Sequence, residues 1–365
     1  MTEKRRGKAT ITEVAKLAGV STSTAGRVLG DYGYASEEIR LKVRRSAERL
    51  GYRPNQIARS MITGRTRTIG VVAGDIQSPF YAGIMRGISD VARQAGFGVI
   101  LTNSDESAEL ESEAVKLLLG KQVDGLIVAP SEMGDAAHLR RAVRDGIPVV
   151  QVDRVVKGLK AASVTIDNRA AARQAVAMLL AAGHRRVGIL AELEHRSRSE
   201  IRELMAQVRS GNTDVRAMFP TWPRFLGYLD AHEEAGIPVD FDLVARVGTY
   251  SSAQARRLVA ELLSGPSRPS ALFTADGLMT ASAVAAVADL GLSIPGELSI
   301  IGFDDLDWMS FYGRGITAVA QPLTEIGETA ARLMLEMLGG GRKALRDLVL
   351  PAALNLRGSV EAPPR

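Results

Sequence analysis

The sequence predicts an α/β protein in which an N-terminal all-α head with a helix-turn-helix precedes a two-lobed core of two doubly wound parallel sheets. Residues 1–67 have helical patterns and a net charge of +9, whereas the remainder carries −4 of the total of +5. After residue 68, short apolar runs alternate with helical patterns, which is typical of buried parallel sheet with helical crossovers. These runs are about twice as many as one such sheet needs, so two lobes with a cleft between them are expected.

A capping box opens the head. Thr10 and Glu13 can each satisfy a free amide at the start of a helix, and Gly19 ends that helix because the next turn needs a residue that tolerates positive φ. Ser21 can cap a second helix and Ser36 a third. Two short helices around a tight turn are the helix-turn-helix plan.

The second helix of such a motif enters the major groove of DNA with its N-terminal side chains toward the base edges. In this chain those side chains are Thr22, Ser23 and Thr24, with Arg27 one turn later. Thr10, Ser21 and Ser36, at the starts of the three helices, are also expected to contact DNA. Arg27 can bind guanine with two hydrogen bonds or hold a phosphate; the alternative is a solvated helix charge. Gly26 costs a helix interior roughly 1 kcal/mol relative to alanine.

The whole chain is expected to divide into a head at 1–53, a hinge helix and linker at 54–67, and a core at 68–365. We expect a first lobe at about 68–182 and 319–349, and a second at about 183–318 and 350–365. The expected strands cover residues 69–73, 98–102, 124–129, 148–152, 163–166, 186–190, 270–274 and 298–303, with helices such as 80–95 and 170–182 between them. Segment 192–223 does not fit this alternation and is interpreted as an insertion or an elaborated loop, within which Ile201, Leu204, Met205 and Val208 can line a helix face.

Composition excludes several kinds of site. The chain has no cysteine, which removes disulfides, thiolate zinc sites and a cysteine nucleophile. Its four histidines do not occur at metal-ligand spacing, so neither a metal nor a cofactor is expected. The basic N-terminus has no apolar run after it and no apolar run of membrane-spanning length occurs, so the expected location is the cytoplasm.

The segment ATITEVAKLAGVSTSTAGRVL resembles the DNA-binding head of the LacI–GalR family of bacterial transcription regulators. GYRPNQIARSMITGRTRTIGVV resembles the hinge and first core strand of that family. SPFYAGIMRGI, DGLIVAP, VDR, DNRAAA, LAAGHRRVGIL, GFDD and TAVAQPL then follow in the family's order. The resemblance covers nearly the whole chain and implies a periplasmic-binding-protein-like core that closes around a small molecule.

The same resemblance implies a role for the hinge. Residues 54–62 are expected to fold into a short helix when a homodimer binds operator DNA, and two such helices open the minor groove. Met61 stands where relatives usually have leucine and can still insert between base steps. Asn55 and Arg59 are expected near the DNA backbone and groove, while Gly26 departs from the serine of many relatives.

Effector residues are expected at the ends of core strands, where ligands bind in parallel α/β sheets. A polyol ligand needs carboxylates and arginine or asparagine for its hydroxyl groups, and an aromatic ring for its apolar face. The resemblance assigns the first contact loop to four residues, Asp75, Gln77, Phe80 and Tyr81. It also implies Arg154 in VDR, Tyr250 as a stacking aromatic, and Asp304 in GFDD as a hydroxyl acceptor. For Phe80 the alternative is core packing, and for Arg154 a surface ion pair.

Three further assignments leave alternatives open. Arg224 in RFLGY fits the family's arginine, although Arg196 or Arg198 can substitute for it. Asp276 lacks the asparagine that often precedes it in relatives, and it can simply cap a helix. Asp167 follows another strand and has the same alternative.

Three classes of function compete. The first is a regulator, expected to be a repressor, that binds double-stranded operator DNA as a homodimer under control of a sugar, sugar acid or related metabolite. A transport solute-binding protein is disfavoured by the +9 head and by the lack of a signal peptide. An α/β enzyme is disfavoured because no phosphate-binding loop, G-x-S-x-G, metal spacing or G-x-G-x-x-G after a strand occurs. The end of the chain has no apolar heptads, so no tetramerising coiled coil is expected.

Overall fold

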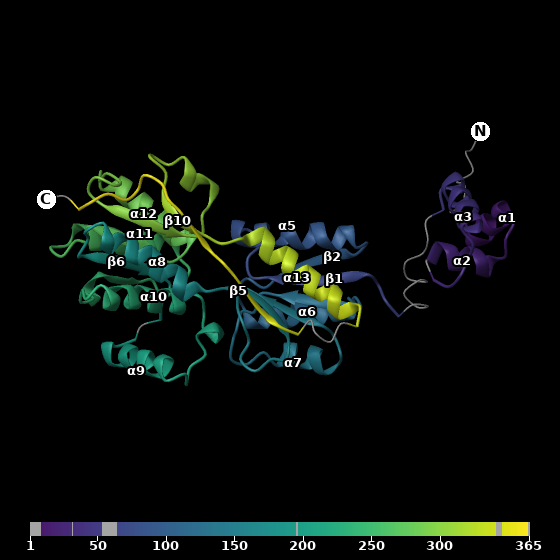
Figure 1. Cartoon of the computed structure of the whole chain (residues 1–365), viewed down its shortest axis with the longest axis horizontal. Helices are drawn as coiled ribbons and strands as arrows, with labels where there is room; N and C mark the ends of the chain where they lie inside the picture. Colours follow the sequence, from purple (N-terminus) through teal and green to yellow (C-terminus); the bar gives the residue numbers. More distant parts are fainter. Residues whose placement is uncertain (1–8, 31, 53–63, 195, 341–344, 364–365) are drawn as a thin grey trace. The chain divides into compact units, whose positions relative to one another are not determined.

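The computed structural model describes residues 9–30, 32–52, 64–194, 196–340 and 345–363 (Figure 1). The chain folds as two compact units that meet in the sequence between Thr68 and Ile69. Each unit has its own apolar core, so each is described by itself.

The head consists of α1 (Ile11–Ala18), α2 (Thr22–Gly30) and α3 (Glu37–Leu50). The capping box at the start of α1 is present, with Glu13 accepting from the Thr10 amide at 2.7 Å. Gly19 ends α1 in the left-handed region at φ +67°. Val14 and Val43 are among the side chains that form the small core of the three helices. The predicted helix-turn-helix is therefore confirmed.

Gly26 does not interrupt α2, which continues to Gly30. A Cβ added at Gly26 would lie 3.5 Å from the Tyr32 hydroxyl and 3.6 Å from Ile11 Cδ1, which is ordinary contact. The packing within the head therefore does not require a glycine at this position.

The second unit contains two six-stranded sheets, one in each lobe. The first has the order β11-β5-β4-β3-β1-β2, and its strands are β1 (Thr68–Ala73), β2 (Gly98–Asn103), β3 (Gly125–Val128), β4 (Val149–Val152), β5 (Ala162–Ile166) and β11 (Asp347–Leu350). The second has the order β12-β10-β9-β8-β6-β7, and its strands are β6 (Val187–Ala191), β7 (Val244–Arg246), β8 (Ala271–Thr274), β9 (Ser299–Phe303), β10 (Thr317–Ala320) and β12 (Ala353–Asn355). The strand pairs from β11 to β1 in the first sheet and from β10 to β7 in the second are parallel, whereas β12 is antiparallel to β10. The expectation of two mainly parallel sheets is confirmed.

Helices cover both sheets. The first lobe contains α5 (Pro79–Gln94), α6 (Ala108–Gly120), α7 (Ala137–Arg144) and α13 (Leu323–Leu338). The second contains α8 (Asn168–Ala181), α9 (Arg198–Arg209), α10 (Thr221–Glu234), α11 (Ser252–Ser264), α12 (Gly277–Asp289) and the 3₁₀ turns η1 (Val215–Ala217), η2 (Phe241–Leu243) and η3 (Asp307–Ser310). Within the described residues, no helix is long and apolar enough to span a bilayer.

Two helix pairs approach backbone to backbone. A Cβ on Gly327 of α13 would lie 2.0 Å from the carbonyl oxygen of Ile84 in α5. In the other lobe, a Cβ on Gly227 of α10 would lie 2.2 Å from the carbonyl oxygen of Arg169 in α8. Such close contact leaves little freedom within a lobe, so the loops at the strand ends are held on rigid supports.

The chain passes between the lobes three times, from β5 to α8, from β10 to α13, and from β11 to β12 (Figure 1). Helix α8 packs on strands of the second sheet, so the first crossing lies at Asp167. The expected boundary near residue 182 is therefore too late, because residues 168–181 cover the second sheet instead of the first.

Segment 192–223, which did not fit the strand–helix alternation, contains α9, η1 and the first residues of α10. Helix α9 buries Ile201 and Leu204, with Met205 and Val208 packed beside them, as the spacing of these residues predicts. At η1 the chain reaches the first lobe, where Arg216 Nη1 lies 3.1 Å from Asp347 Oδ2. The segment then ends in the first turn of α10, so it is an elaborated connection that links the two lobes.

Candidate functional site

The N-terminal half of α2 presents a row of exposed hydroxyl groups. Ser21 Oγ caps the helix by accepting from the Thr24 amide at 3.1 Å, and it lies 2.9 Å from Ser23 Oγ. Arg27 Nη2 donates to Thr24 Oγ1 at 3.3 Å, so its guanidinium lies along the same face, on which Thr22 is also exposed. The structure thus brings together five of the predicted DNA-binding residues at the N-terminal end of α2.

The other predicted DNA-binding residues fall into two groups. Thr10 and Ser36 are exposed N-caps of α1 and α3, the kind of position where helix amides also bind phosphate. Asn55, Arg59 and Met61 lie outside the residues that the structure describes, as does the expected hinge helix at 54–62.

The second unit contains a cavity of about 550 Å³. Its walls are the loops at the carboxyl ends of strands in both sheets, which is where ligands bind in parallel α/β folds. The lining residues are Asp75, Gln77, Ser78, Phe80, Tyr81, Asp105, Glu106, Asp153, Arg154, Glu192, Phe219, Pro220, Thr221, Arg224, Tyr250, Asp276 and Asp304.

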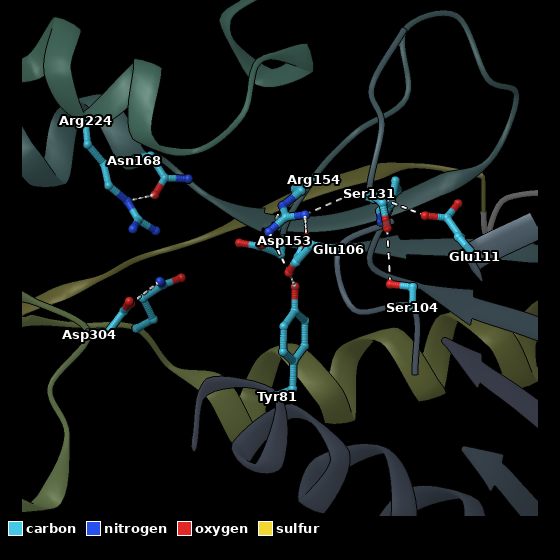
Figure 2. Close-up of polar contacts among 12 residues, drawn as sticks. Tyr81, Ser104, Glu106, Glu111, Ser131, Asp153, Arg154, Asn168, Arg224 and Asp304 are labelled. Carbon is cyan, nitrogen blue, oxygen red and sulfur yellow. Dashed lines mark hydrogen bonds and ion pairs between the residues drawn. The ribbon is translucent and has the colours of Figure 1, made fainter. Parts of the chain in front are cut away.

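Arg154 organises the first-lobe wall (Figure 2). Its guanidinium binds both carboxylate oxygens of Glu106, and its Nε lies 3.2 Å from Asp153 Oδ2. Tyr81 donates its hydroxyl to Glu106 at 3.1 Å, and the ring of Phe219 stacks 4.4 Å from Arg154 Cζ. Arg154 is only 6% exposed, so this arginine is a buried part of the wall.

The second-lobe wall follows the order of the strands. Asp304, Asp276 and Glu192 follow β9, β8 and β6, which are neighbours in the second sheet. Tyr250 follows the next strand, β7, and is 55% exposed. Asp304 accepts from Gln321 Nε2 at 2.6 Å, and Asp276 accepts from the Met279 amide at 2.8 Å as the N-cap of α12.

Arg224 is fixed from three sides. Its Nε donates to Asn168 Oδ1 at 2.8 Å and its Nη1 donates to the Ala275 carbonyl at 2.6 Å, while its Cζ lies 3.8 Å from the Phe303 ring centre (Figure 2). Arg196 and Arg198, the open alternatives, instead lie over the rings of Trp222 and Phe241 and do not line the cavity. Of the three arginines, the structure brings Arg224 to the cavity.

Four of the lining residues have a strained backbone. Asp105, Glu106, Asp153 and Asp304 have φ values of +47°, +57°, +67° and +65°. Non-glycine residues in this region cost of order 1–3 kcal/mol each and concentrate at functional sites. The concentration of this strain around the cavity supports a binding role for these loops.

The structure brings nine of the ten predicted effector residues to the cavity. The exception is Asp167, which caps α8 by accepting from the Ala170 amide at 2.9 Å and lines an adjacent hollow of about 280 Å³. Its side chain satisfies a helix amide, as the alternative interpretation had it. Asp153, which precedes Arg154 in VDR, lines the cavity beside it. The lining residues that the sequence did not single out are Ser78, Asp105, Glu106, Glu192, Phe219, Pro220 and Thr221.

Two of these omissions have different causes. Glu192 directly follows β6, so the expectation that ligands bind at the carboxyl ends of parallel strands also predicts this residue. Phe219 lies in the segment that did not fit the pattern, and nothing local indicates that it reaches Arg154. The carboxylates of the cavity can thus be predicted from the positions of the strands, whereas Phe219 cannot.

Burial raises the pKa values of three carboxyl groups of the cavity. Burial, followed by the charges of Asp304 and Glu192, raises the pKa of Asp276 to about 7, although the Met279 amide and Arg224 oppose the shift. Burial raises the pKa of Asp153 to about 6 despite the adjacent Arg154. Burial likewise raises the pKa of Glu192. The cavity therefore retains protons near neutral pH.

Asp276→Asn is expected to stabilise the ligand-free protein above pH 7, by roughly 1–3 kcal/mol. A raised pKa means that the folded state gains stability by binding a proton, and this gain is lost as pH rises through about 7. The advantage of the variant should shrink as pH falls from 8 to 5, where the wild-type carboxyl is protonated. Urea denaturation at both pH values measures it, and an equal difference at the two would contradict the expected pKa.

Comparison with known proteins identifies both units. Residues 10–55 match the family model described as bacterial regulatory proteins, lacI family, and residues 176–360 match the periplasmic binding protein-like domain. The chain is 33% identical over 355 residues to the HTH-type transcriptional regulator PtxS of Pseudomonas aeruginosa, covering 97% of this chain and 96% of the relative. It is 30% identical over 362 residues to the transcriptional repressor CytR of Escherichia coli K12, covering 99% of each.

Solved structures agree in fold. The transcriptional regulator CelR in complex with cellobiose superposes with a TM-score of 0.68 at 27% identity, covering 97% of this chain and all of that one. The lac repressor dimer bound to operator superposes with a TM-score of 0.79 at 24% identity, with the same coverage. The matched head, the strand-end cavity and the full-length relatives agree, and the chain belongs to the lacI family of bacterial regulatory proteins.

Proposed function

We propose that this regulator is a homodimeric repressor whose affinity for operator DNA is set by a small molecule bound in the cavity of the second unit. The observation that carries the proposal is the cavity itself, whose polar walls are held in fixed positions on a chain that also has an exposed helix-turn-helix face. We place the repressor in the cytoplasm, where bacterial operator DNA is found.

The head supplies the chemistry for DNA binding. The exposed hydroxyls of α2 and the Arg27 guanidinium match the groups that contact base edges and phosphates. The net charge of +9 on residues 1–67 favours binding to a polyanion and makes the affinity dependent on salt.

The cavity supplies the chemistry for effector binding. Its volume of about 550 Å³ lies in the range of small-molecule sites, and its carboxylates accept hydrogen bonds from hydroxyl groups. A related regulator is described in complex with cellobiose and another with bound ribose. Both comparisons support a hydroxyl-rich ligand for this protein.

Exposed apolar side chains support a dimer. Leu101 on the edge strand β2 is 42% exposed, and Leu110 and Leu117 on the adjacent α6 are 41% and 52% exposed. Ile76, which donates its amide to Asn103 at the end of β2, is 53% exposed. Exposed apolar side chains gathered on neighbouring elements are typical of an interface, and a dimer supplies the two heads that a two-fold symmetric operator needs.

The effector acts through its difference in affinity for the two states of the protein. A ligand that binds better to the DNA-competent state strengthens operator binding, and one that binds better to the other state weakens it. The factor by which the effector changes operator affinity equals the factor by which the operator changes effector affinity. Closure of the two lobes around an effector would change the contacts that segment 192–223 makes with the first lobe, which are the Arg216–Asp347 ion pair and the Phe219–Arg154 contact.

The test is selection of DNA from a random duplex library with the purified full chain. We expect enrichment of a sequence with two-fold symmetry, bound by a dimer with an affinity that falls steeply as salt rises. Failure to enrich any sequence, with the protein folded and dimeric, would overturn the proposal. Addition of metabolites to the selected complex then identifies those that change its affinity.

A further inference from the structure

We propose that the effector carries a positive charge and is a hydroxylated small molecule with a protonated amine, of which an amino sugar is the simplest example. This inference rests on the proposed function, because it names the chemistry of the ligand in the same cavity. It decides against the sugar acids that the sequence leaves open, and equally against sugar phosphates.

The first step is the row of carboxylates at the second-lobe edge. Asp304, Asp276 and Glu192 follow three neighbouring parallel strands. Adjacent strands lie about 4.8 Å apart, so the three carboxylates fall within a span of roughly 10 Å. Asp75, at the end of β1, lines the same cavity from the first lobe.

The second step is that these four carboxylates have no cationic partner. Within the described part of the chain, no lysine or arginine is ion-paired with them, because Arg154 is already engaged by Glu106 and Asp153. Arg224 donates its two assigned hydrogen bonds to the neutral oxygens of Asn168 and Ala275. The positive charge that this row lacks must therefore come from solvent, from protons or from the ligand.

Arg224 itself points to a ligand. It is 5% exposed and lines the cavity, yet its second terminal nitrogen makes no hydrogen bond to a described residue. This nitrogen is open to the cavity, so it can donate to a ligand hydroxyl in place of water. This gives the ligand a hydroxyl beside the acidic row.

The charges of the whole cavity favour a cation over an anion, although Arg224 keeps one guanidinium nitrogen free to donate. Seven carboxylates line it against two guanidiniums, and no lysine lies among the described lining residues. Recognition of a carboxylate or phosphate uses arginine or lysine that is free to bind it, and here one arginine is consumed by carboxylates. A neutral polyol satisfies the acceptors but leaves their mutual repulsion, whereas an ammonium group offsets it.

Tyr250 completes the cation site. Its half-exposed ring follows the strand next to the acidic row, so a cation can lie between the ring face and the carboxylates. Burial, followed by the charges of Asp276, Asp304, Glu192 and Asp75, raises the pKa of Tyr250, so all four carboxylates act on the place where the ring lies.

The first experiment measures the charge preference of the cavity without any knowledge of the ligand. Because the chain has no cysteine, Ser78→Cys provides one thiol at the cavity and Ser264→Cys provides one on the exposed end of α11. Each variant is reacted with a trimethylammonium-ethyl and with a sulfonatoethyl methanethiosulfonate. We expect the ratio of cationic to anionic rates to be at least tenfold higher for Ser78→Cys than for Ser264→Cys.

The carboxylates are tested in the same background. Adding Glu192→Gln and Asp276→Asn to Ser78→Cys should lower that ratio by about tenfold, because two of the unpaired charges are removed. Glu194→Gln is the matched control, since its side chain is 78% exposed and it does not line the cavity. An equal rate ratio at the two thiols overturns the inference.

The second experiment measures ligand-induced thermal stabilisation by matched hexoses, 2-amino-2-deoxyhexoses, their N-acetyl forms and hexuronic acids. We expect the amines to stabilise at concentrations at least tenfold lower than their neutral or acidic counterparts, with Glu192→Gln but not Glu194→Gln removing the difference. Preference for an acid or a neutral hexose overturns the inference. If no compound of the panel binds, the ratio of cationic to anionic reaction rates at Ser78→Cys relative to Ser264→Cys decides whether the inference stands. DNA selection is independent of both, so the charge inference can fail while the repressor function stands.

Discussion

Arg154→Met is expected to lower the free energy of unfolding by roughly 3–5 kcal/mol, the cost of removing one partner of a buried ion pair. The guanidinium is 6% exposed and engages Glu106, Asp153 and the Pro130 carbonyl, while Phe219 covers its face. Without it, two carboxylates and the Tyr81 hydroxyl remain in the wall with no positive charge. Urea denaturation of the second unit measures the loss.

A matched control separates burial from charge. Arg173 on α8 pairs with Glu234 at 2.7 Å, but the two side chains are 46% and 57% exposed. Arg173→Met should therefore cost less than about 1 kcal/mol. Adding Glu106→Gln to Arg154→Met should restore part of the stability, because it removes one of the uncompensated charges. Equal losses for the two arginine variants would show that Arg154 does not hold the wall together.

Arg27→Ala is the second large effect, and it falls on the other unit. We expect operator affinity to drop by roughly 2–6 kcal/mol per dimer, because each head loses an arginine contact worth about 1–3 kcal/mol. Effector-induced stabilisation of the second unit should not change, since Arg27 lies in a separately folded unit. Fluorescence anisotropy with the selected operator measures the first quantity and thermal denaturation the second.

The salt dependence of this variant identifies the contact. If Arg27 holds a phosphate, the slope of log affinity against log salt should fall by about 1 per head while sequence preference remains. If it binds guanine, discrimination at one base pair of each half-site should relax. Arg86→Ala, on the exposed side of α5 in the other unit, is the control and should leave operator binding unchanged. Unaltered binding by Arg27→Ala would remove this residue from the DNA interface.

Most of the fold is encoded in patterns that are visible locally. Runs such as IGVVA and LSIIGF are apolar throughout because both faces of a parallel sheet are covered, and they became β1 and β9. The strands β7, β11 and β12 were missed because they lie at sheet edges and are only partly buried, so they form no continuous apolar run; the short strand β10 was missed as well. The lobe boundary at Asp167 was misplaced because an amphipathic helix does not specify which sheet it covers.

The cavity residues that the sequence identified share a simple geometry. Asp75, Asp276 and Asp304 come within two residues of a strand end, and the carboxyl ends of parallel strands converge at one edge. Glu106 reaches Arg154 through a loop with a left-handed backbone at two successive residues, which no propensity indicates. Long-range pairs of this kind depend on tertiary structure and not on the neighbouring sequence.

The connection from β6 to α10 has a consequence for how this protein acquires new specificities. It supplies Phe219 and Pro220 to the cavity, with Thr221 following at the start of α10, and it supplies the Arg216–Asp347 pair to the other lobe. Ligand selection and lobe closure can therefore diverge by exchange of one contiguous cassette, provided that Leu193, Ile201 and Leu204, which belong to the hydrophobic core, stay apolar. The same property makes residues 192–220 the natural region to randomise when such a regulator is engineered as a metabolite sensor.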